Sequence, residues 1–232
     1  MGYSSINYTV MRDTMHHCKT STRLQKAIEN SIANQYMVAQ EDVLSVSPVK
    51  ESSTKYVVSG KRTFKAAQGY PGKKVAVLNF ANNHSIGGAP YYAGAQEESL
   101  CRASTLLPCL EAMKQPFYEK HARQYDRGII DHNGNDDLIY TPDVIVFKTD
   151  ELEDPIYPQM LPEGKWYKID VITCAAPDYR SGPMPADYEK RIYSRIKRIL
   201  DVAASEKVEV LILGAWGCGA FKNPIDIVAR TF

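Results

Sequence analysis

The sequence lacks the excess of positive charge that marks many proteins that bind polyanions. Lys and Arg number 28 and Asp and Glu 27 among the 232 residues, so that the net charge is +1. Such a balance provides no overall field to attract DNA, RNA or an anionic membrane. We therefore expect no membrane partner and no sequence-specific binding of nucleic acid, and a polyanion would have to be recognised by a local site.

Cysteine patterns are also missing. The five cysteines are odd in number, widely spaced and never arranged as C-x-x-C (Cys18, Cys101, Cys109, Cys174, Cys218). This spacing argues against a disulfide framework and against a zinc site, and it favours a reducing compartment. The N-terminus has no apolar leader, and no apolar run reaches the roughly 18 residues of a membrane span. We expect a soluble, cytoplasmic protein.

Metal-ligand spacing is absent as well. The five histidines show no H-x-x-x-H pairing. The segment "DHNGNDD" (131–137) resembles the start of a calcium loop, but it has no Glu at the twelfth position from Asp131, and Asn-Gly is a common turn pair. A solvated turn is the simpler interpretation, and no metal or redox cofactor is expected.

Hydrophobic periodicity predicts alternating strands and helices. Residues 11 to about 40 have helical spacing, and strands are predicted at 54–60, 75–80, within 137–150, at 168–177 and at 208–214. A short helix precedes Gly69, another helix runs from Gln96 to about Met113 with Pro108 expected to end or kink it, and an amphipathic helix covers 186–207. The alternation predicts a three-layer α/β/α sandwich.

Two predicted strands, "VAVLNF" and "VEVLILG", run directly into glycine-rich segments. Ligands collect beyond the carboxyl ends of strands in open α/β sheets, so the two loops can face one ligand. Gly87 and Gly88 in the first loop, and Gly214, Gly217 and Gly219 in the second, allow close backbone approach to a phosphate. Neither loop fits a nucleotide fingerprint, and the glycines alone favour simple strand-to-helix turns over a phosphate site.

The segment "GGAPYYAGAQEES" (87–99) adds two adjacent glutamates. Neighbouring residues of a helix point roughly 100° apart, so Glu97 and Glu98 cannot form a face-to-face pair and should have separate tasks. Acidic residues in a first helical turn are also ordinary capping. Taken alone, the glutamates leave both interpretations open.

Longer blocks of sequence add a family resemblance. "LNFANNHSIGGAPYYAGAQEESLCRASTL", "IYTPDVIVFK", "IDVITCAAPD" and "LILGAWGCGAFKNP" resemble, in this order, the bacterial-type poly(ADP-ribose) glycohydrolases. The signature of that family is three glycines, a short gap and Gln-Glu-Glu. The resemblance implies a macrodomain-like fold with a mixed sheet. It also implies hydrolysis of the ribose–ribose O-glycosidic bonds of poly(ADP-ribose), free or on modified proteins, to release ADP-ribose without a cofactor.

The resemblance also implies roles for single residues. Glu98 matches the glutamate that protonates the departing ribose oxygen and then activates water, and Glu97 matches its partner, which holds ribose hydroxyls. Gln96 fixes the loop, and Asn82 is the candidate contact of the distal ribose. The remaining implied ligand-binding residues are Asn79, Gly87, Gly88 and Ala89 in the first loop region, and Gly217, Cys218, Gly219, Ala220 and Phe221 in the second. Phe221 would pack against the ribose next to the scissile bond.

The sequence departs from the family pattern in two places. Ala89 stands at the third signature glycine and Pro90 follows it, which either weakens contact with the diphosphate or is tolerated in a β-region conformation. The chain also stops at "DIVARTF", where relatives continue, so we expect the C-terminal strand and helix of the domain to be missing. Residues 1–54 are expected to form a helical lead-in packed on a catalytic domain of residues 55–232.

Three functions therefore stay open at this point. The first is a glycohydrolase with Glu98 as acid and base, and the second is a weak or inactive ADP-ribose-binding module. The third is an unrelated nucleotide-binding protein whose Gln-Glu-Glu segment only caps a helix. The sequence is compatible with exo- and with endo-cleavage, and His84, Tyr91 and Tyr92 either contact the ligand or face water.

Overall fold

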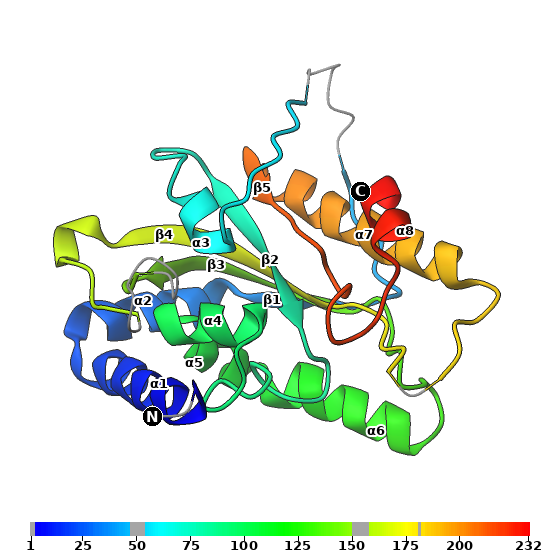
Figure 1. Cartoon of the computed structure of the whole chain (residues 1–232), viewed down its shortest axis with the longest axis horizontal. Coiled ribbons are helices and arrows are strands. Elements are labelled where there is room, and N and C mark those ends of the chain that lie inside the picture. The colour runs from blue at the N-terminus through cyan, green and yellow to red at the C-terminus, as the bar shows by residue number, and fades with distance from the viewer. Residues whose placement is uncertain (1–2, 47–53, 150–157, 181) are drawn as a thin grey trace.

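A mixed five-stranded sheet runs through the centre of the molecule (Figure 1). This computed structural model describes residues 3–46, 54–149, 158–180 and 182–232. The strands are β1 (Tyr36–Val38), β2 (Val75–Ala81), β3 (Leu138–Val146), β4 (Tyr167–Ala175) and β5 (Val210–Ile212), in the order β1-β3-β4-β2-β5. Because β2 is parallel to both β4 and β5, the carboxyl ends of these three strands meet at one edge of the sheet.

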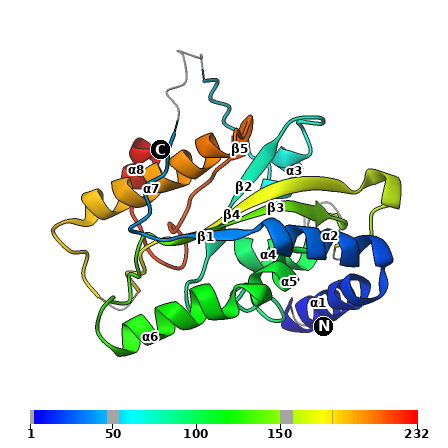
Figure 2. The same ribbon diagram turned by 180° about the vertical axis from the view of Figure 1, so that it is seen from behind.

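Helices cover both faces of the sheet, as predicted (Figures 1 and 2). One apolar core joins the first face to α1 (Tyr3–Thr20), α3 (Thr63–Ala67), α4 (Gln96–Ala103), α5 (Leu106–Ala112) and the π-helical segment η1 (Lys114–Glu119), which continues into α6 (Lys120–Asp126). A second core joins the other face to α7 (Tyr188–Ser205) and α8 (Ile225–Thr231). The remaining helices are α2 (Thr22–Asn34), which packs along β3, and the 3-10 turn η2 (Glu163–Lys165).

Strand β2 confirms the prediction of a strand buried on both faces. Val77 lies in the core below α4, whereas Ala76 and Leu78 lie in the core below α7. All three side chains are fully buried. A strand with no solvent-facing side must be apolar throughout, which explains the continuous run of apolar residues. The short helix before Gly69, the strand at 168–177 and the amphipathic helix at 186–207 are likewise confirmed as α3, β4 and α7.

The prediction of one helix over residues 11 to about 40 is wrong at its C-terminal end. Helix α2 ends at Asn34, and Tyr36–Val38 form the edge strand β1, paired antiparallel with Leu138–Tyr140. The side chain of Gln35 holds this change of direction, since its Nε2 donates to the Cys109 carbonyl at 3.0 Å. Pairing with β3 outweighs the helical spacing of these residues. The sequence of residues 11–40 alone contains no information on this distant strand.

The strand predicted at 54–60 is also wrong. Residues 54–59 have no strand or helix assignment, and Tyr56, Val57 and Val58 are strongly exposed, Val58 completely so. These residues have the apolar and β-branched character of a strand, but the segment has no neighbour to pair with in the described structure. A strand outside a sheet has unpaired backbone groups and is not stable by itself.

The helix predicted from Gln96 to Met113 is interrupted, though not at Pro108. Helix α4 ends at Ala103, whose carbonyl accepts from the backbone N–H groups of Phe147 and Lys148, and the N–H of Thr105 donates to the Ile145 carbonyl at 3.0 Å. This pairing with the end of β3 breaks the helix. Pro108 lies in the first turn of α5, where a missing N–H costs nothing.

Within the segment 137–150, predicted as two short strands, Leu138–Val146 form the single strand β3. Its register with β4 shifts between Thr141 and Val144, and Asp143 has a φ of 60°. Pro142 has no N–H for the ladder, so a bulge at this point keeps both halves of the strand in the sheet.

Strand β1 lies before residue 54 and nevertheless belongs to the sheet, but the division of the chain at that residue stays a prediction. Among the helices of the described residues, none is both long and apolar enough to cross a membrane.

Candidate active site

Gln96 joins the first turn of α4 to the exposed edge of β2. Strand β5 pairs only with Val75–Val77, so the next backbone groups of β2 have no strand partner on that side. The side chain of Gln96 supplies one: its Oε1 accepts from the Phe80 N–H at 2.9 Å, and its Nε2 donates to the Leu78 carbonyl at 2.8 Å. Gln96 therefore fixes the start of α4 against the end of β2.

Glu97 lies beneath the end of β2 with 3% of its surface exposed. Its Oε1 accepts from Asn79 Nδ2 at 3.1 Å, and its Oε2 accepts from the backbone N–H of Asn82 at 2.9 Å. Burial raises the pKa of Glu97 to about 8 and the charge of Glu98 adds to this, while the two hydrogen bonds act in the opposite direction. Burial therefore favours the protonated form of Glu97, which can donate a hydrogen bond.

Glu98 faces the turn on the other side of the glycine pair. It is 7% exposed, and its Oε1 accepts from the backbone N–H of Ala89 at 3.1 Å. Its Oε2 is buried and has no hydrogen-bond partner among the described residues. A buried carboxylate oxygen without a partner is costly, and native structures keep such atoms mainly where a ligand or reaction uses them.

Gly88 is the point at which the two carboxyl groups converge. A Cβ atom at this position would lie 2.9 Å from Cδ of Glu98 and 3.3 Å from Oε2 of Glu97, and would collide with Oε1 of Glu98. The φ of Gly88 is +68°, a conformation that favours glycine. The adjacent glutamates point to different partners, as expected for neighbours on a helix, and yet border the same small space.

The arrangement excludes simple capping as the role of the two glutamates. Neither side chain caps α4, whose N-cap Ala95 has no side-chain hydrogen bond. Instead the carboxylates bind N–H groups of the preceding loop, at Asn82 and Ala89. The third interpretation left open by the sequence, in which this segment only caps a helix, does not fit this geometry.

Asn79 and Asn82 have different surroundings. Asn79 is fully buried, and its Nδ2 donates to both Glu97 and Thr173, so this side chain supports Glu97 from within the sheet. Asn82 is half-buried at the surface of the loop, where its Oδ1 accepts from the N–H groups of His84 and Ser85. Only Asn82 has a surface that a ligand can reach.

Ala89, which stands at the third signature glycine, has an ordinary backbone conformation. It is not among the residues with positive φ, whereas Gly87 and Gly88 are, at +66° and +68°. Its N–H is kept and binds Glu98. Ala89 therefore does not have the positive φ that would favour glycine, and its effect on binding of the diphosphate stays a prediction.

The second glycine loop lies beyond the end of β5 and is built around Asn223. The buried Asn223 side chain donates from Nδ2 to the carbonyls of Pro177 and Gly217, both at 2.9 Å. A Cβ at Gly217, whose φ is +71°, would lie 2.6 Å from this same Nδ2. In the described structure no hydrogen bond uses the N–H groups of Gly219, Ala220 or Phe221. A loop with several free N–H groups is suited to binding phosphate.

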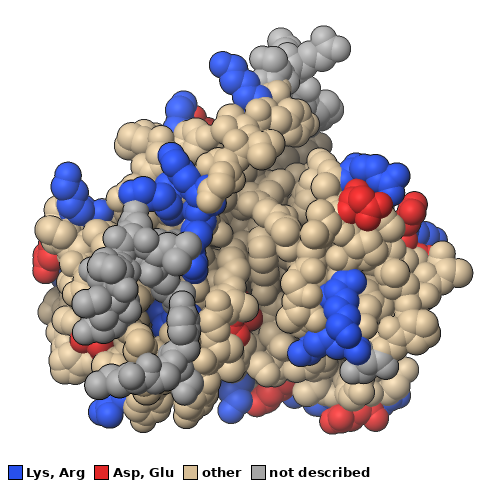
Figure 3. Space-filling model, in the orientation of Figure 1, with Lys and Arg blue, Asp and Glu red and all other residues tan. Residues whose placement is uncertain are grey.

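Phe221 lies at the surface of this loop beneath a cation that the sequence analysis missed. The guanidinium carbon of Arg180 is 5.0 Å from the ring centre of Phe221, and Arg180 also pairs with Asp178. The loop itself is half-exposed at Cys218 and exposed at Gly219 and Ala220. In the space-filling view, a furrow with few charged atoms on its walls runs down the middle of this face, over β2 and the loop before α8 (Figure 3).

Other residues that hold the site were missed for one shared reason. Arg102, Thr173 and Asn223 act by hydrogen bonds to residues outside their own helix, strand or loop. Asn223 lies in the block "GAFKNP", next to predicted residues. A polar residue between a glycine loop and a helix was the feature from which its role in the site could have been predicted. Arg102 and Thr173 lie within predicted elements, where nothing in the sequence sets them apart.

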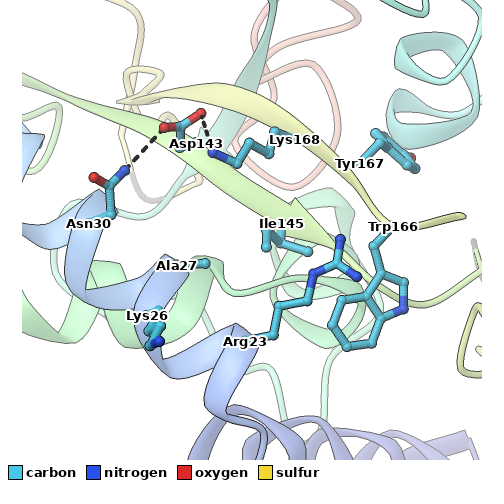
Figure 4. Close-up of a pocket in the computed structure, with 9 residues that line it drawn as sticks. All are labelled: Arg23, Lys26, Ala27, Asn30, Asp143, Ile145, Trp166, Tyr167 and Lys168. Carbon is cyan, nitrogen blue, oxygen red and sulfur yellow. Dashed lines mark hydrogen bonds and ion pairs between the residues drawn. The ribbon is translucent and has the colours of Figure 1, made fainter. Parts of the chain in front are cut away.

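A surface pocket elsewhere contains none of the predicted residues (Figure 4). It is lined by residues of α2, β3 and the start of β4, among them Arg23, Trp166 and Lys168. The start of β4 is at the opposite end of that strand from the carboxyl edge. Within the described residues no group of three potential metal-ligating side chains occurs, and the five cysteines are unpaired.

Comparisons with known proteins agree on one family. The family model described as "Microbial-type PARG, catalytic domain" matches residues 7–149. Poly(ADP-ribose) glycohydrolase (PARG) from Thermomonospora curvata is 28% identical with a TM-score of 0.84, over 97% of this chain and 85% of that one. The Deinococcus radiodurans enzyme, solved with ADP-ribose, is 34% identical with a TM-score of 0.62, over 75% and 67%. A search of curated proteins returns no match.

Proposed function

Since this chain belongs to the microbial-type PARG catalytic-domain family, we propose that it hydrolyses the ribose–ribose O-glycosidic bonds of poly(ADP-ribose) and releases ADP-ribose. The substrate is the free polymer or the polymer on modified proteins. The observation that carries the proposal is the pair of buried carboxyl groups at Gly88, one of which, Glu98, has an oxygen without a partner.

Glu98 is the general acid and base of the proposed reaction. Cleavage of a glycosidic bond passes through an oxocarbenium-like state and needs a proton on the leaving oxygen. Glu98 gives its proton to that oxygen as the C–O bond breaks, and then takes a proton from the water that adds to the ribose carbon. The N–H of Ala89 binds the other carboxyl oxygen and so directs Oε2 toward the substrate.

Glu97 holds the ribose on which the bond is cleaved. With a pKa of about 8, it carries a proton at neutral pH and can bind ribose hydroxyls without adding a second negative charge. Asn79 is assigned a positioning role rather than a ligand contact because it is fully buried and its Nδ2 donates to Glu97 and Thr173. Asn82, at the surface, is the contact of the distal ribose.

The second loop binds the diphosphate. The backbone of residues 217–221 supplies N–H donors, with Cys218 as a small side chain between glycines, and Phe221 packs against the ribose. Gly87, Gly88 and Ala89 border the substrate from the other loop. Unpaired thiols suit a reducing compartment, so the cytoplasm is the proposed location.

The test compares wild type with Glu98→Gln on purified poly(ADP-ribose), with free ADP-ribose as the readout. We expect a loss of kcat of about 10²- to 10⁴-fold, the range for removal of a general acid, with an unchanged melting temperature. Calorimetry with ADP-ribose is the second measurement. Equal inactivity of both proteins together with tight ADP-ribose binding would make the chain a binding module, and tighter binding of ADP than of ADP-ribose would contradict the family assignment of the site.

A further inference from the structure

Three tyrosines form an aromatic surface beside the catalytic loop. Tyr8 of α1 lies 5.7 Å from Tyr91 and 6.1 Å from Tyr92, measured between ring centres, and Tyr91 and Tyr92 are 6.4 Å apart. Tyr8 is 41% and Tyr92 63% exposed. The guanidinium of Arg12 lies 5.8 Å from the ring of Tyr8. We call Tyr8, Tyr91, Tyr92 and Arg12 the tyrosine platform.

Buried hydrogen bonds hold this platform in place. Asn7, 5% exposed, donates from Nδ2 to the carbonyls of Tyr92 and Ala93, both at 3.1 Å. From the other side the fully buried Arg102 donates to the carbonyls of Pro90 and Ala93, at 2.8 and 2.7 Å. Large aromatic side chains are thus displayed to solvent on a fixed backbone, an arrangement that lowers the entropic cost of binding.

The position of the platform relates it to the leaving group. Ala89, whose N–H binds Glu98, is two residues from Tyr91. In the proposed reaction Glu98 protonates the oxygen at which the remaining polymer begins, so this remaining chain leaves the site past Glu98. Its repeating units have adenine rings and diphosphates. Adenine stacks on aromatic side chains, and a guanidinium attracts phosphate.

We propose that the tyrosine platform is a subsite for the polymer on the leaving-group side of the scissile bond, where adenines of the following ADP-ribose units stack on Tyr8 and Tyr92. This inference rests on the proposed function. It gives α1 a direct part in substrate choice, favouring polymer over single ADP-ribose.

Binding to the Glu98→Gln protein tests the subsite without turnover. The probes are a fluorescently labelled long poly(ADP-ribose) chain, followed by anisotropy, and ADP-ribose, followed by calorimetry. We expect Tyr8→Ala combined with Tyr92→Ala to weaken polymer binding by at least about fivefold more than ADP-ribose binding, since stacking contributes roughly 1–3 kcal/mol per base. Tyr193→Ala is the matched control, because Tyr193 is 60% exposed on α7.

The outcomes separate the two proposals. Equal weakening for both probes would assign the tyrosines to support of the loop, and no weakening for either would leave polymer binding independent of this surface; each result overturns the subsite. If the variants pass this test but wild type releases no ADP-ribose from polymer, the proposed hydrolysis fails and the subsite stands. Circular dichroism and melting temperatures confirm that each variant is folded.

Discussion

Asn79 donates a hydrogen bond from Nδ2 to Oε1 of Glu97 over 3.1 Å, inside a region that water does not reach. Asn79 lies in β2 and Glu97 in α4, so the contact fixes the side-chain carboxyl group of Glu97 against the sheet. A side chain held in this way keeps one orientation before substrate arrives, which is the condition for positioning a ribose.

Asn79→Ala should lower kcat/KM by up to about tenfold, because a hydrogen bond between uncharged groups contributes about 0.5–1.5 kcal/mol. Asn79→Asp should do more damage, since it buries a second acid beside Glu97. Steady-state kinetics and thermal melts measure both effects. Asn34→Ala, at an exposed position of α2, is the control. Full activity of Asn79→Ala would show that Glu97 keeps its place without this donor.

Gly88→Ala should almost abolish activity. The added methyl group would collide with Oε1 of Glu98, and Ala is strained at a φ of +68°. A displacement of the acid by about 1 Å costs on the order of 100-fold in rate. Gly94→Ala is the matched control, because a Cβ at Gly94 meets nothing within 4 Å. If both variants kept their activity, the glycine pair would not define the catalytic geometry.

The fold was largely predictable from local apolar patterns, and the failures share one cause. The strands β2 and β4 are mostly buried and apolar, and the helix α7 is apolar along one face. Both patterns are visible in a short stretch of sequence. In contrast, β1 and the break after Ala103 exist because β3 offers them backbone partners. The location of a distant partner strand cannot be read from the segment that it pairs with.

The candidate site shows the same division. The glycines and the two glutamates were identified from sequence motifs, whereas the distinction between Asn79 and Asn82 required the structure. Both asparagines lie in "LNFAN", three residues apart, and one faces the interior while the other faces the loop surface. Strand β2 ends at Ala81, between them. The role of an asparagine at a strand end thus depends on which side of that boundary it lies.

Asn223→Ala should weaken ADP-ribose binding and lower the free energy of unfolding by about 2–3 kcal/mol, because it leaves the buried carbonyls of Pro177 and Gly217 with one donor fewer. Calorimetry and denaturant unfolding measure the two effects. Lys222→Ala is the control, because Lys222 lies in the same loop and its side chain is exposed. Unchanged affinity would mean that the loop keeps its shape without the Asn223 side chain.

The raised pKa of Glu97 predicts a pH dependence of stability. The reference pKa is 4.5 and the folded protein holds it at about 8, so between these values the native state binds a proton that the unfolded state has released. The free energy of unfolding should therefore fall as pH rises through this window, by up to about 1.4 kcal/mol per pH unit. Glu97→Gln removes this contribution, so its free energy of unfolding should fall less between pH 5 and pH 8 than that of wild type.

Urea unfolding of wild type and Glu97→Gln at pH values from 5 to 8 measures this difference. Only the difference between the two proteins is informative, because other groups titrate in both. The hydrogen bonds from Asn79 and Asn82 to Glu97 oppose the rise of its pKa. The double variant Glu97→Gln with Asn79→Ala has no carboxyl group at position 97, so it should show the same pH dependence as Glu97→Gln alone. Parallel pH curves for wild type and Glu97→Gln would mean that Glu97 is ionised in the folded protein.

Ala89→Gly restores the third glycine of the family signature and should change kcat/KM by no more than about twofold. Ala89 does not have a positive φ, and its N–H, which binds Glu98, is present in either residue. The cost lies in the unfolded chain, where glycine gains conformational freedom, so the free energy of unfolding should fall by about 0.4–1 kcal/mol. Ala93→Gly in the same loop should show a similar loss of stability. A tenfold rise in kcat/KM for Ala89→Gly alone would instead show that the alanine restrains the catalytic loop.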